Sequence, residues 1–241
     1  MDGTAVKEIA ALQDATQKTV MINGITYSDR ALKPVIFEAR RPEPLKFLSL
    51  SALVVYLKQN CERLADGKMF ILVDDINRVS LVQEYLGADN RRTVFAKVEP
   101  ITTDSFSFGG WMEMEKFIIN AKTYFLPSDE LSEIIQIASS VSKDSGVDTK
   151  DDGVSQQVNV RIGVRGALTE KKETKGIYRL QARRIFPEVV QPDGDFIFRL
   201  RPSDPVTAAI FEADGGAWKL QALSNIRSWL ESQDLGLPIL A

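Results

Sequence analysis

Residues 195–201 read DFIFRLR, and this stretch decides the fold class. Its Phe196, Phe198 and Leu200 alternate with Ile197, Arg199 and Arg201, which is the period of a strand with one buried face. The same alternation recurs in VNVRIGVR (158–165) and IYRLQARR (177–184). Because GALTEKKETKG (166–176) and PEVVQPDG (187–194) separate them as loops, the three strands predict an antiparallel sheet.

The chain before this sheet mixes helical and strand patterns. Helices are predicted over 5–17, from Ser49 or Ser51 to about Ala65, over 111–125 and over 128–141. Gly67 is placed to end the second helix, and Ser128 to cap the fourth. A hairpin is predicted at Asn23-Gly24, and strands over 35–39, 69–73, 78–85 and 91–98.

A polar stretch, SKDSGVDTKDDG (142–153), interrupts these patterns. Near the end of the chain, IFEADGGAWKL (210–220) predicts a hairpin turning at Asp214-Gly215, and 223–233 a closing helix with Ile226, Trp229 and Leu230 inward. The fold class is therefore predicted to be α+β. We expect an α/β part over 1–142, a linker or loop over 143–153, and an antiparallel part with a C-terminal helix over 154–241.

The residue composition limits the kinds of catalytic and metal-binding site that this chain can form. The 241 residues include no histidine and one cysteine, Cys61, so histidine-based catalysis, imidazole-ligated metals and cysteine-rich clusters are excluded within one chain. Glycine-rich nucleotide motifs and the GxSxG elbow are also missing. The sequence thus predicts no cofactor and no catalytic residue set. No apolar run reaches the roughly 18 to 20 residues that span a bilayer, so we expect no membrane partner. With one cysteine the chain can form no internal disulfide, so we expect a cytoplasmic protein.

Asp74 and Asp75 are the strongest candidates for the chemistry that remains. They follow the apolar strand MFILV (69–73), and acids at a strand end can bind Mg²⁺ through oxygen. The alternative is that they form a turn leading into Asn77, which the turn preference of Asp favours.

The most specific feature is the distribution of charge. The chain has a formal net charge of -3, but ten basic and five acidic residues give 158–201 a net charge of +5. The period of two places six arginines opposite the apolar residues: Arg161, Arg165, Arg179, Arg183, Arg199 and Arg201. Such a surface can bind a polyanion, an acidic protein surface or another subunit, or it can simply be solvated. It lacks interleaved aromatic residues, and Trp111 is interpreted as a core anchor.

Several patterned stretches carry a family resemblance. They are LSLSALVVYLKQN (48–60), FILVDD (70–75), SLVQEYL (80–86), MEKFIINAKTYFLPSDELSEIIQIA (114–138), VNVRIGVRGA (158–167) and DFIFRLR (195–201). Their order over about 45–201 resembles the YfdQ-like family of uncharacterised phage and prophage proteins. The family pattern has Asp-Tyr-His after the second core strand, where this chain has Glu84, Tyr85 and Leu86. The resemblance implies a phage or prophage origin and action inside a bacterial host, and it implies no activity.

Three functions remain open. The first is a non-enzymatic phage or prophage accessory or structural protein that acts by protein association, as a homo-oligomer. The second is a nucleic-acid-binding accessory of phage replication or recombination that uses the arginine surface. The third is a carboxylate-metal enzyme centred on Asp74 and Asp75.

Overall fold

The computed structural model describes residues 4, 7, 19–28, 43–62, 68–83, 92–101, 105–141, 147–151, 156–162, 168–203 and 205–241. The chain divides into two compact units, one of Met1–Glu43 with Tyr85–Thr93 and one of Pro44–Glu84 with Val94–Ala241. The predicted strand over 35–39 lies outside the described residues, as does the helix over 5–17 except for Lys7.

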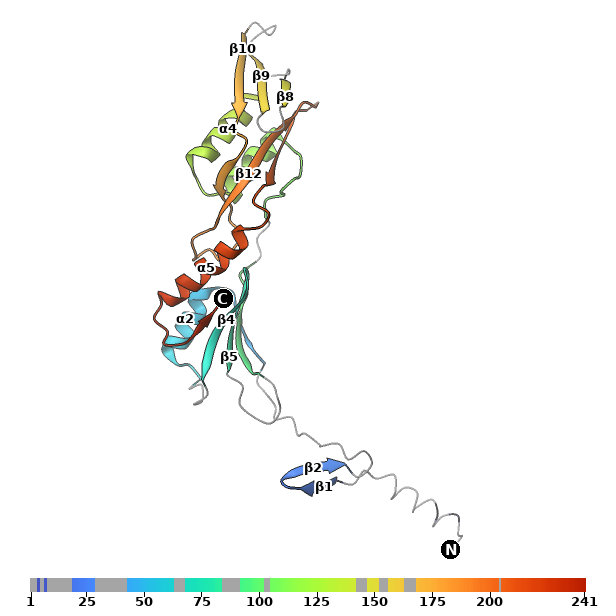
Figure 1. The fold of residues 1–241 in the computed structure, drawn as a ribbon, viewed down its shortest axis with the longest axis vertical. Helices are drawn as coiled ribbons and strands as arrows, with labels where there is room; N and C mark the ends of the chain where they lie inside the picture. The colour runs from blue at the N-terminus through green and yellow to red at the C-terminus, as the bar shows by residue number, and fades with distance from the viewer. Residues whose placement is uncertain are drawn as a thin grey trace. The chain divides into compact units, whose positions relative to one another are not determined.

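The first unit contains the hairpin that the sequence predicts. Strand β1 (Thr19–Ile22) pairs antiparallel with β2 (Ile25–Ser28), and together they form a two-stranded sheet (Figure 1). Asn23 and Gly24 have positive φ angles of 51° and 78°, the conformation that a two-residue hairpin turn requires. The hairpin at Asn23-Gly24 is confirmed.

A mixed five-stranded sheet lies in the second unit. Its strands are β3 (Leu45–Phe47), β4 (Met69–Asp75), β5 (Arg78–Gln83), β6 (Val94–Val98) and β14 (Ile239–Leu240), in the order β14-β4-β5-β6-β3. The three central strands are antiparallel, and the outer two, β14 and β3, run parallel to their neighbours. The three predicted strands between 69 and 98 are confirmed.

Helices α2 (Leu50–Gln59) and α5 (Trp218–Glu231) share a core with this sheet (Figure 1). The hydroxyl of Ser49 accepts a hydrogen bond from Ala52 N at 3.2 Å, which confirms Ser49 as the N-cap of α2. The predicted end of this helix at Gly67 is wrong. Asn60 adopts a left-handed conformation with φ of 47°, and its N–H bonds Leu57 O, so the helix stops there.

A hairpin at Asp214-Gly215 is not formed. Strand β13 (Thr207–Glu212) is followed by a turn in which the Asp214 carboxylate accepts from Gly216 N at 2.9 Å, and α5 begins at Trp218. The predicted closing helix is therefore confirmed but starts five residues earlier than 223. Ile226 and Leu230 are fully buried on its inner face, and Trp229 packs against the same core.

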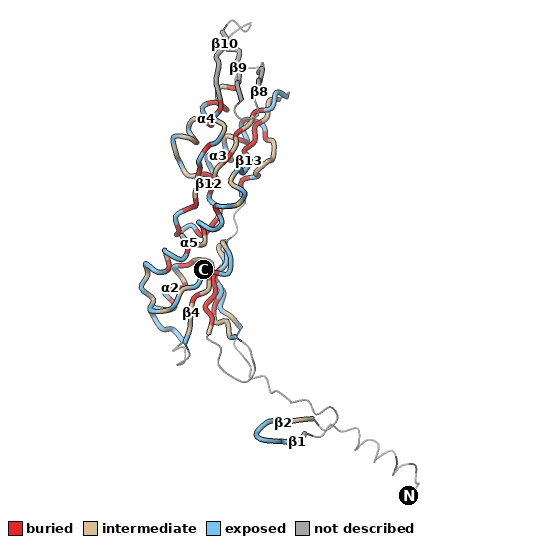
Figure 2. Tube along the Cα trace, in the orientation of Figure 1, coloured by how far each residue is buried: buried red, intermediate tan, exposed pale blue. Residues whose placement is uncertain are grey.

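A four-stranded antiparallel sheet carries the second core of this unit. Its order is β11 (Tyr178–Gln181), β12 (Asp193–Arg201), β13 and β7 (Met112–Glu113). Helices α3 (Met114–Tyr124) and α4 (Asp129–Val141) pack on one face, and buried residues line the layer between them and β12 (Figure 2). The predicted helix over 111–125 starts at Met114 because Met112 and Glu113 pair with β13. Ser128 caps α4 as predicted, accepting from Leu131 N at 3.1 Å.

A three-stranded antiparallel sheet corrects the predicted pairing of the arginine-bearing strands. Its order is β10 (Leu168–Thr174), β9 (Gln156–Ile162) and β8 (Val147–Asp151). Residues 166–176 and 142–153 were predicted as loops, and each contains a strand of this sheet. The prediction that β9 joins β11 and β12 in one sheet is also wrong. Strand β9 instead pairs along one edge with β8 and along the other with β10, the strands that precede and follow it in the sequence.

The architecture is α+β, as predicted, with an antiparallel sheet and a helix near the C-terminus. Helices α3 and α4 share one core with β11, β12 and β13, although the sequence placed them on opposite sides of a border at 143–153. Residues 142–146 and 152–155 of that border lie outside the described part of the chain.

Candidate functional site

Strand β12 presents two different faces. Phe196, Phe198 and Leu200 belong to the core beneath α3 and α4, and each is at most 2% exposed. The alternate residues lie on the face away from these helices, and we call them the outer strip of β12: Asp193, Asp195, Ile197, Arg199 and Arg201. The first four are half-buried and Arg201 is exposed. The alternation that the sequence predicted for 195–201 is confirmed.

Two aromatic residues that the sequence did not assign to this surface lie on its face. Phe211 is paired in register with Ile197, and Trp111 precedes the short strand β7 at the far side of β13. The two rings lie 5.8 Å apart at 70°, and the Arg201 guanidinium lies 3.9 Å from the centre of the Trp111 ring. Trp111 is half-buried on this surface rather than a core anchor. Its place depends on the β7–β13 pairing, which no local pattern reveals.

The six predicted arginines do not form one surface among the described residues. Arg161 lies in β9, which belongs to the three-stranded sheet, and Arg165 lies outside the described residues. Arg183 is exposed beyond the end of β11, where its backbone N–H donates to Tyr124 O at 2.7 Å. The four-stranded sheet therefore brings together the remaining three.

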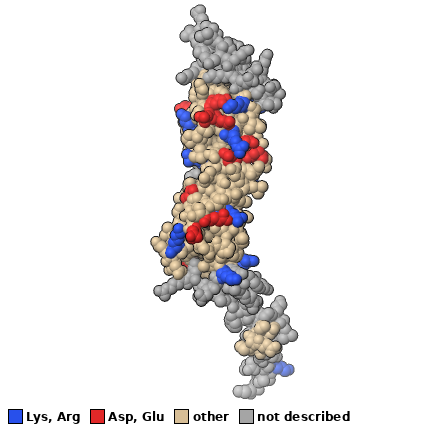
Figure 3. Space-filling model, turned by 60° about the vertical axis from the view of Figure 1, so that its left-hand side comes forward, with Lys and Arg blue, Asp and Glu red and all other residues tan. Residues whose placement is uncertain are grey.

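These three, Arg179, Arg199 and Arg201, share their sheet face with carboxylates. Arg179 is paired in register with Asp195, and its Nη2 lies 3.5 Å from the Asp193 carboxylate. Figure 3 shows acidic and basic side chains next to one another on the described surface in that view, rather than one basic area. The face therefore combines both signs of charge with apolar and aromatic side chains.

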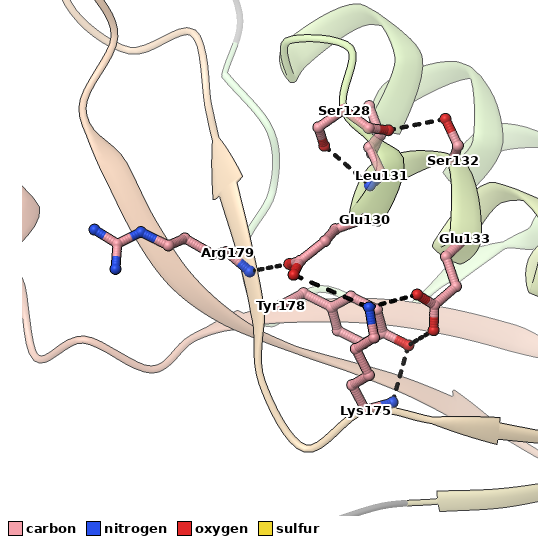
Figure 4. Close-up of polar contacts among 8 residues, drawn as sticks. All are labelled: Ser128, Glu130, Leu131, Ser132, Glu133, Lys175, Tyr178 and Arg179. Carbon is pink, nitrogen blue, oxygen red and sulfur yellow. Dashed lines mark hydrogen bonds and ion pairs between the residues drawn. The ribbon is translucent and has the colours of Figure 1, made fainter.

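A polar cluster joins the start of α4 to β11 (Figure 4). Lys175 Nζ lies 2.6 Å from the Glu133 carboxylate and 4.0 Å from that of Glu130, which also accepts a hydrogen bond from Arg179 N. The buried Tyr178 hydroxyl accepts from Lys175 N at 3.0 Å and donates to Glu133 at 3.4 Å. Burial, with the nearby Glu133 carboxylate, raises the pKa of Tyr178 to about 12. The polar groups of this cluster are hydrogen-bonded or ion-paired to one another, and these contacts hold α4 against β11.

Arg184 lies where the two cores of the second unit meet. Its guanidinium is 5.3 Å from the ring centres of Phe108 and Phe196, which belong to one core, and 3.9 Å from Trp218, which belongs to the other. Its Nη1 donates to Glu212, and burial lowers its pKa despite this carboxylate. The remaining edge, Nε and Nη2, has no hydrogen-bond partner.

Close packing accounts for the lack of a hydrogen-bond partner at Nε and Nη2 of Arg184. The Arg184 side chain is 9% exposed, and a Cβ added at Gly194 would lie 2.8 Å from its Nη2 and 2.9 Å from the Phe196 ring, so a larger residue there would have to displace the guanidinium or the ring. The rings of Phe108, Phe196 and Trp218 lie against the guanidinium on the sides that Glu212 does not occupy. Arg184 therefore acts as a structural residue.

Asp74 and Asp75 end strand β4 and are exposed. The Asp74 carboxylate accepts from the Ser80 hydroxyl at 2.5 Å, and that of Asp75 accepts from Ile76 N at 2.7 Å. The carboxylate of the nearby Glu99 forms an ion pair with Arg78, whose Nε lies 2.8 Å from it. Among the described residues, no group of three potential metal ligands is brought together. Both carboxylates thus accept hydrogen bonds from their own β4–β5 hairpin, and Asp75 directly precedes its turn at Ile76-Asn77.

Searches of protein-family models, curated proteins and solved structures find no match to this chain. Of the helices that the structure describes, none has the length and apolar character needed to cross a membrane. What the described geometry offers is a set of surfaces: the outer strip of β12 with its aromatic neighbours, and the apolar side chains of the β1–β2 hairpin.

Proposed function

We propose that this protein is a phage or prophage accessory or structural protein that acts by protein association, including association with further copies of itself. The resemblance of residues 45–201 to YfdQ-like proteins supports the phage origin and action inside a bacterial host. The association is supported by the described surfaces, above all by the β1–β2 hairpin.

The hairpin carries apolar side chains that its own fold leaves in water. Met21 is 71% exposed, Ile22 50% and Ile25 48%, and β1 and β2 form a sheet of two strands. Such a hairpin is marginally stable by itself, because two strands bury too little apolar surface. Covering one of these side chains fully would contribute roughly 1.5 to 3 kcal/mol. A protein surface that packs on the hairpin would therefore stabilise both the contact and the hairpin.

The measurement that tests this proposal is the mass of the full chain in solution across a concentration series. We expect wild type to be heavier than the 26.9 kDa of one chain, and a Met21→Ser/Ile25→Ser variant to need a higher concentration to assemble. Leu220→Ser is the matched control, since Leu220 is 74% exposed on α5 in the other unit. A wild-type mass of 26.9 kDa at every concentration would contradict self-association.

The other two functions have weaker support from the described residues. Asp193 and Asp195 lie on the same strip as Arg199 and Arg201, so the sheet face opposes a polyanion as much as it attracts one. The hydrogen bonds of Asp74 and Asp75 lie within their own hairpin, between β4 and β5.

A further inference from the structure

We infer that two copies of this chain pair through the outer strip of β12, packed face to face and antiparallel about a twofold axis at Ile197. This inference rests on the proposed self-association and gives it a second surface, in addition to the β1–β2 hairpin. The observation that carries it is the order of the side chains along the strip: two acids, one isoleucine, two arginines.

That order is self-complementary. Side chains on one face of a strand are about 7 Å apart, so Asp195 and Arg199 lie about 7 Å on either side of Ile197, and Asp193 and Arg201 about 14 Å. A twofold axis through Ile197, lying in the interface and perpendicular to the strand, sets a second strand antiparallel over the first. Asp195 then faces Arg199 of the copy, and Asp193 faces Arg201. Each contact occurs twice, as in any isologous interface.

The distance between packed sheets suits these pairs. Two sheets that pack face to face lie about 10 Å apart, and their inner side chains interdigitate. An aspartate and an arginine that project from opposite sheets meet across such a gap, while Ile197 and Phe211, which are paired in register, fill its centre. Trp111 and Arg201, already stacked at 3.9 Å, lie at the edge of the same surface and are residue types enriched at interface hot spots.

Neighbouring charges leave the pattern in place. Arg179 on β11 is paired with Asp195, and Glu113 on β7 is paired with Thr207, the partner of Arg201 on β13. Each end of the strip thus has an opposite charge beside it on the paired strands. On β12 itself the acids stay at one end and the arginines at the other, so the two ends remain complementary.

The charge order also selects one arrangement. If the two strips packed parallel, Asp193 and Asp195 would face their own copies, as would Arg199 and Arg201. Like charges set opposite one another at an interface cost several kcal/mol, so the parallel arrangement is disfavoured. A slip of two residues along the strand would remove the central Ile197 contact and leave an end residue without its partner.

The experiment converts the self-complementary strip into two strips of one sign each. Arg199→Asp/Arg201→Asp makes an acidic strip, and Asp193→Lys/Asp195→Lys makes a basic strip. Each variant alone should dimerise on the order of a hundredfold more weakly than wild type, because every facing pair repels. Mixed in equal amounts, the two should form a one-to-one heterodimer, and added salt should weaken it. Sedimentation velocity gives the masses, and circular dichroism shows that each variant is folded.

The matched control is Lys58→Asp/Lys122→Asp, which changes the net charge as the acidic strip does but at exposed positions on α2 and α3. It should dimerise like wild type. If wild type dimerises and the strip variants do so equally well, the strip is not the interface while self-association stands. If wild type dimerises and the mixed variants form no heterodimer, the antiparallel pairing is overturned. If wild type is monomeric throughout, the inference fails together with the proposed self-association.

Discussion

The guanidinium of Arg184 lies 3.9 Å from the centre of the Trp218 ring, the first residue of α5. On its other sides it approaches Phe108 and Phe196, which belong to the core under α3 and α4. One side chain therefore packs into both cores of the second unit. A change at this position is expected to weaken both.

Replacing Arg184 by alanine should lower the free energy of unfolding by about 3 kcal/mol, because it leaves a cavity between three aromatic rings. Arg184→Met, which refills most of that space, should cost about 1 kcal/mol. Urea denaturation measures both values. Arg227→Ala is the control, since Arg227 is half-exposed and forms one surface ion pair with Glu231. An Arg184→Ala variant as stable as Arg227→Ala would contradict this role.

Gln191 should be nearly irreplaceable. Its side chain is 6% exposed and makes four hydrogen bonds, accepting from Arg184 N and Ile185 N and donating to Phe186 O and Val189 O. Gln191→Leu keeps the approximate size but removes the bonds to Arg184 N, Ile185 N and Val189 O, while Phe186 O keeps its bond from Val189 N. We expect a loss of about 3 kcal/mol in unfolding free energy, measured by urea denaturation.

The Gln191→Glu variant keeps the accepting oxygen of the side-chain amide but replaces its donating nitrogen. An ionised carboxylate still accepts from the two N–H groups, but it faces two carbonyl oxygens to which it cannot donate. This variant should therefore be less stable at neutral pH than near pH 4, where the acid carries a proton. Equal stability at both pH values, relative to wild type, would show that the four hydrogen bonds are not as described.

Tyr178 should make stability depend on alkaline pH. Its pKa is about 12 in the folded protein because it is buried, against 10.0 for an exposed tyrosine. The folded state thus keeps a proton that the unfolded chain has released. This contribution is complete below pH 10 and is lost as the pH rises through 12. At pH 11 the loss is about 1.4 kcal/mol.

The Tyr178→Phe variant tests this contribution. It should be about 1 kcal/mol less stable than wild type at pH 8, since it gives up the contacts with Lys175 N and Glu133. Between pH 8 and pH 11 it should lose about 1.4 kcal/mol less than wild type does. Denaturation curves at the two pH values give both numbers. Parallel pH profiles for the two proteins would rule out the raised pKa.

Ser49 and Ser51 offer a matched pair at the start of α2. Ser49 accepts from Ala52 N as the N-cap, whereas the exposed Ser51 lies one residue inside the helix. Ser49→Ala should cost about 1 kcal/mol and Ser51→Ala less than about 0.5 kcal/mol, both measured by thermal unfolding. The reverse order would place the cap at Ser51.

Strong local patterns predicted much of this fold. The alternation in β12 identified its buried face, Ser128 was recognised as a cap, and Ser49 was one of two candidate caps with Ser51. Partners distant in sequence were not predictable. Strand β9 has the same alternation as β11 and β12, yet pairs in another sheet. Strand β10 has four charged residues among seven, so it was taken for a loop.

In the outer strip of β12, too, the local pattern was predictable and the contacts between distant segments were not. Arg199 and Arg201 could be placed on one face from 195–201 alone, and so could Asp195. Phe211 and Trp111 could not, because they reach that face through the pairing of β12 with β13 and of β13 with β7. The net charge of +5 over 158–201 already includes Asp193 and Asp195, and the strand alternation places these two acids on the same face as Arg199 and Arg201.

Sedimentation equilibrium of the full chain, over a concentration series at low and at high salt, tests the central claim of self-association most directly. At low salt we predict a mass that rises above 26.9 kDa with concentration, and at high salt a shift of that rise to higher concentration. A mass of 26.9 kDa at every concentration and both salt levels would contradict the claim.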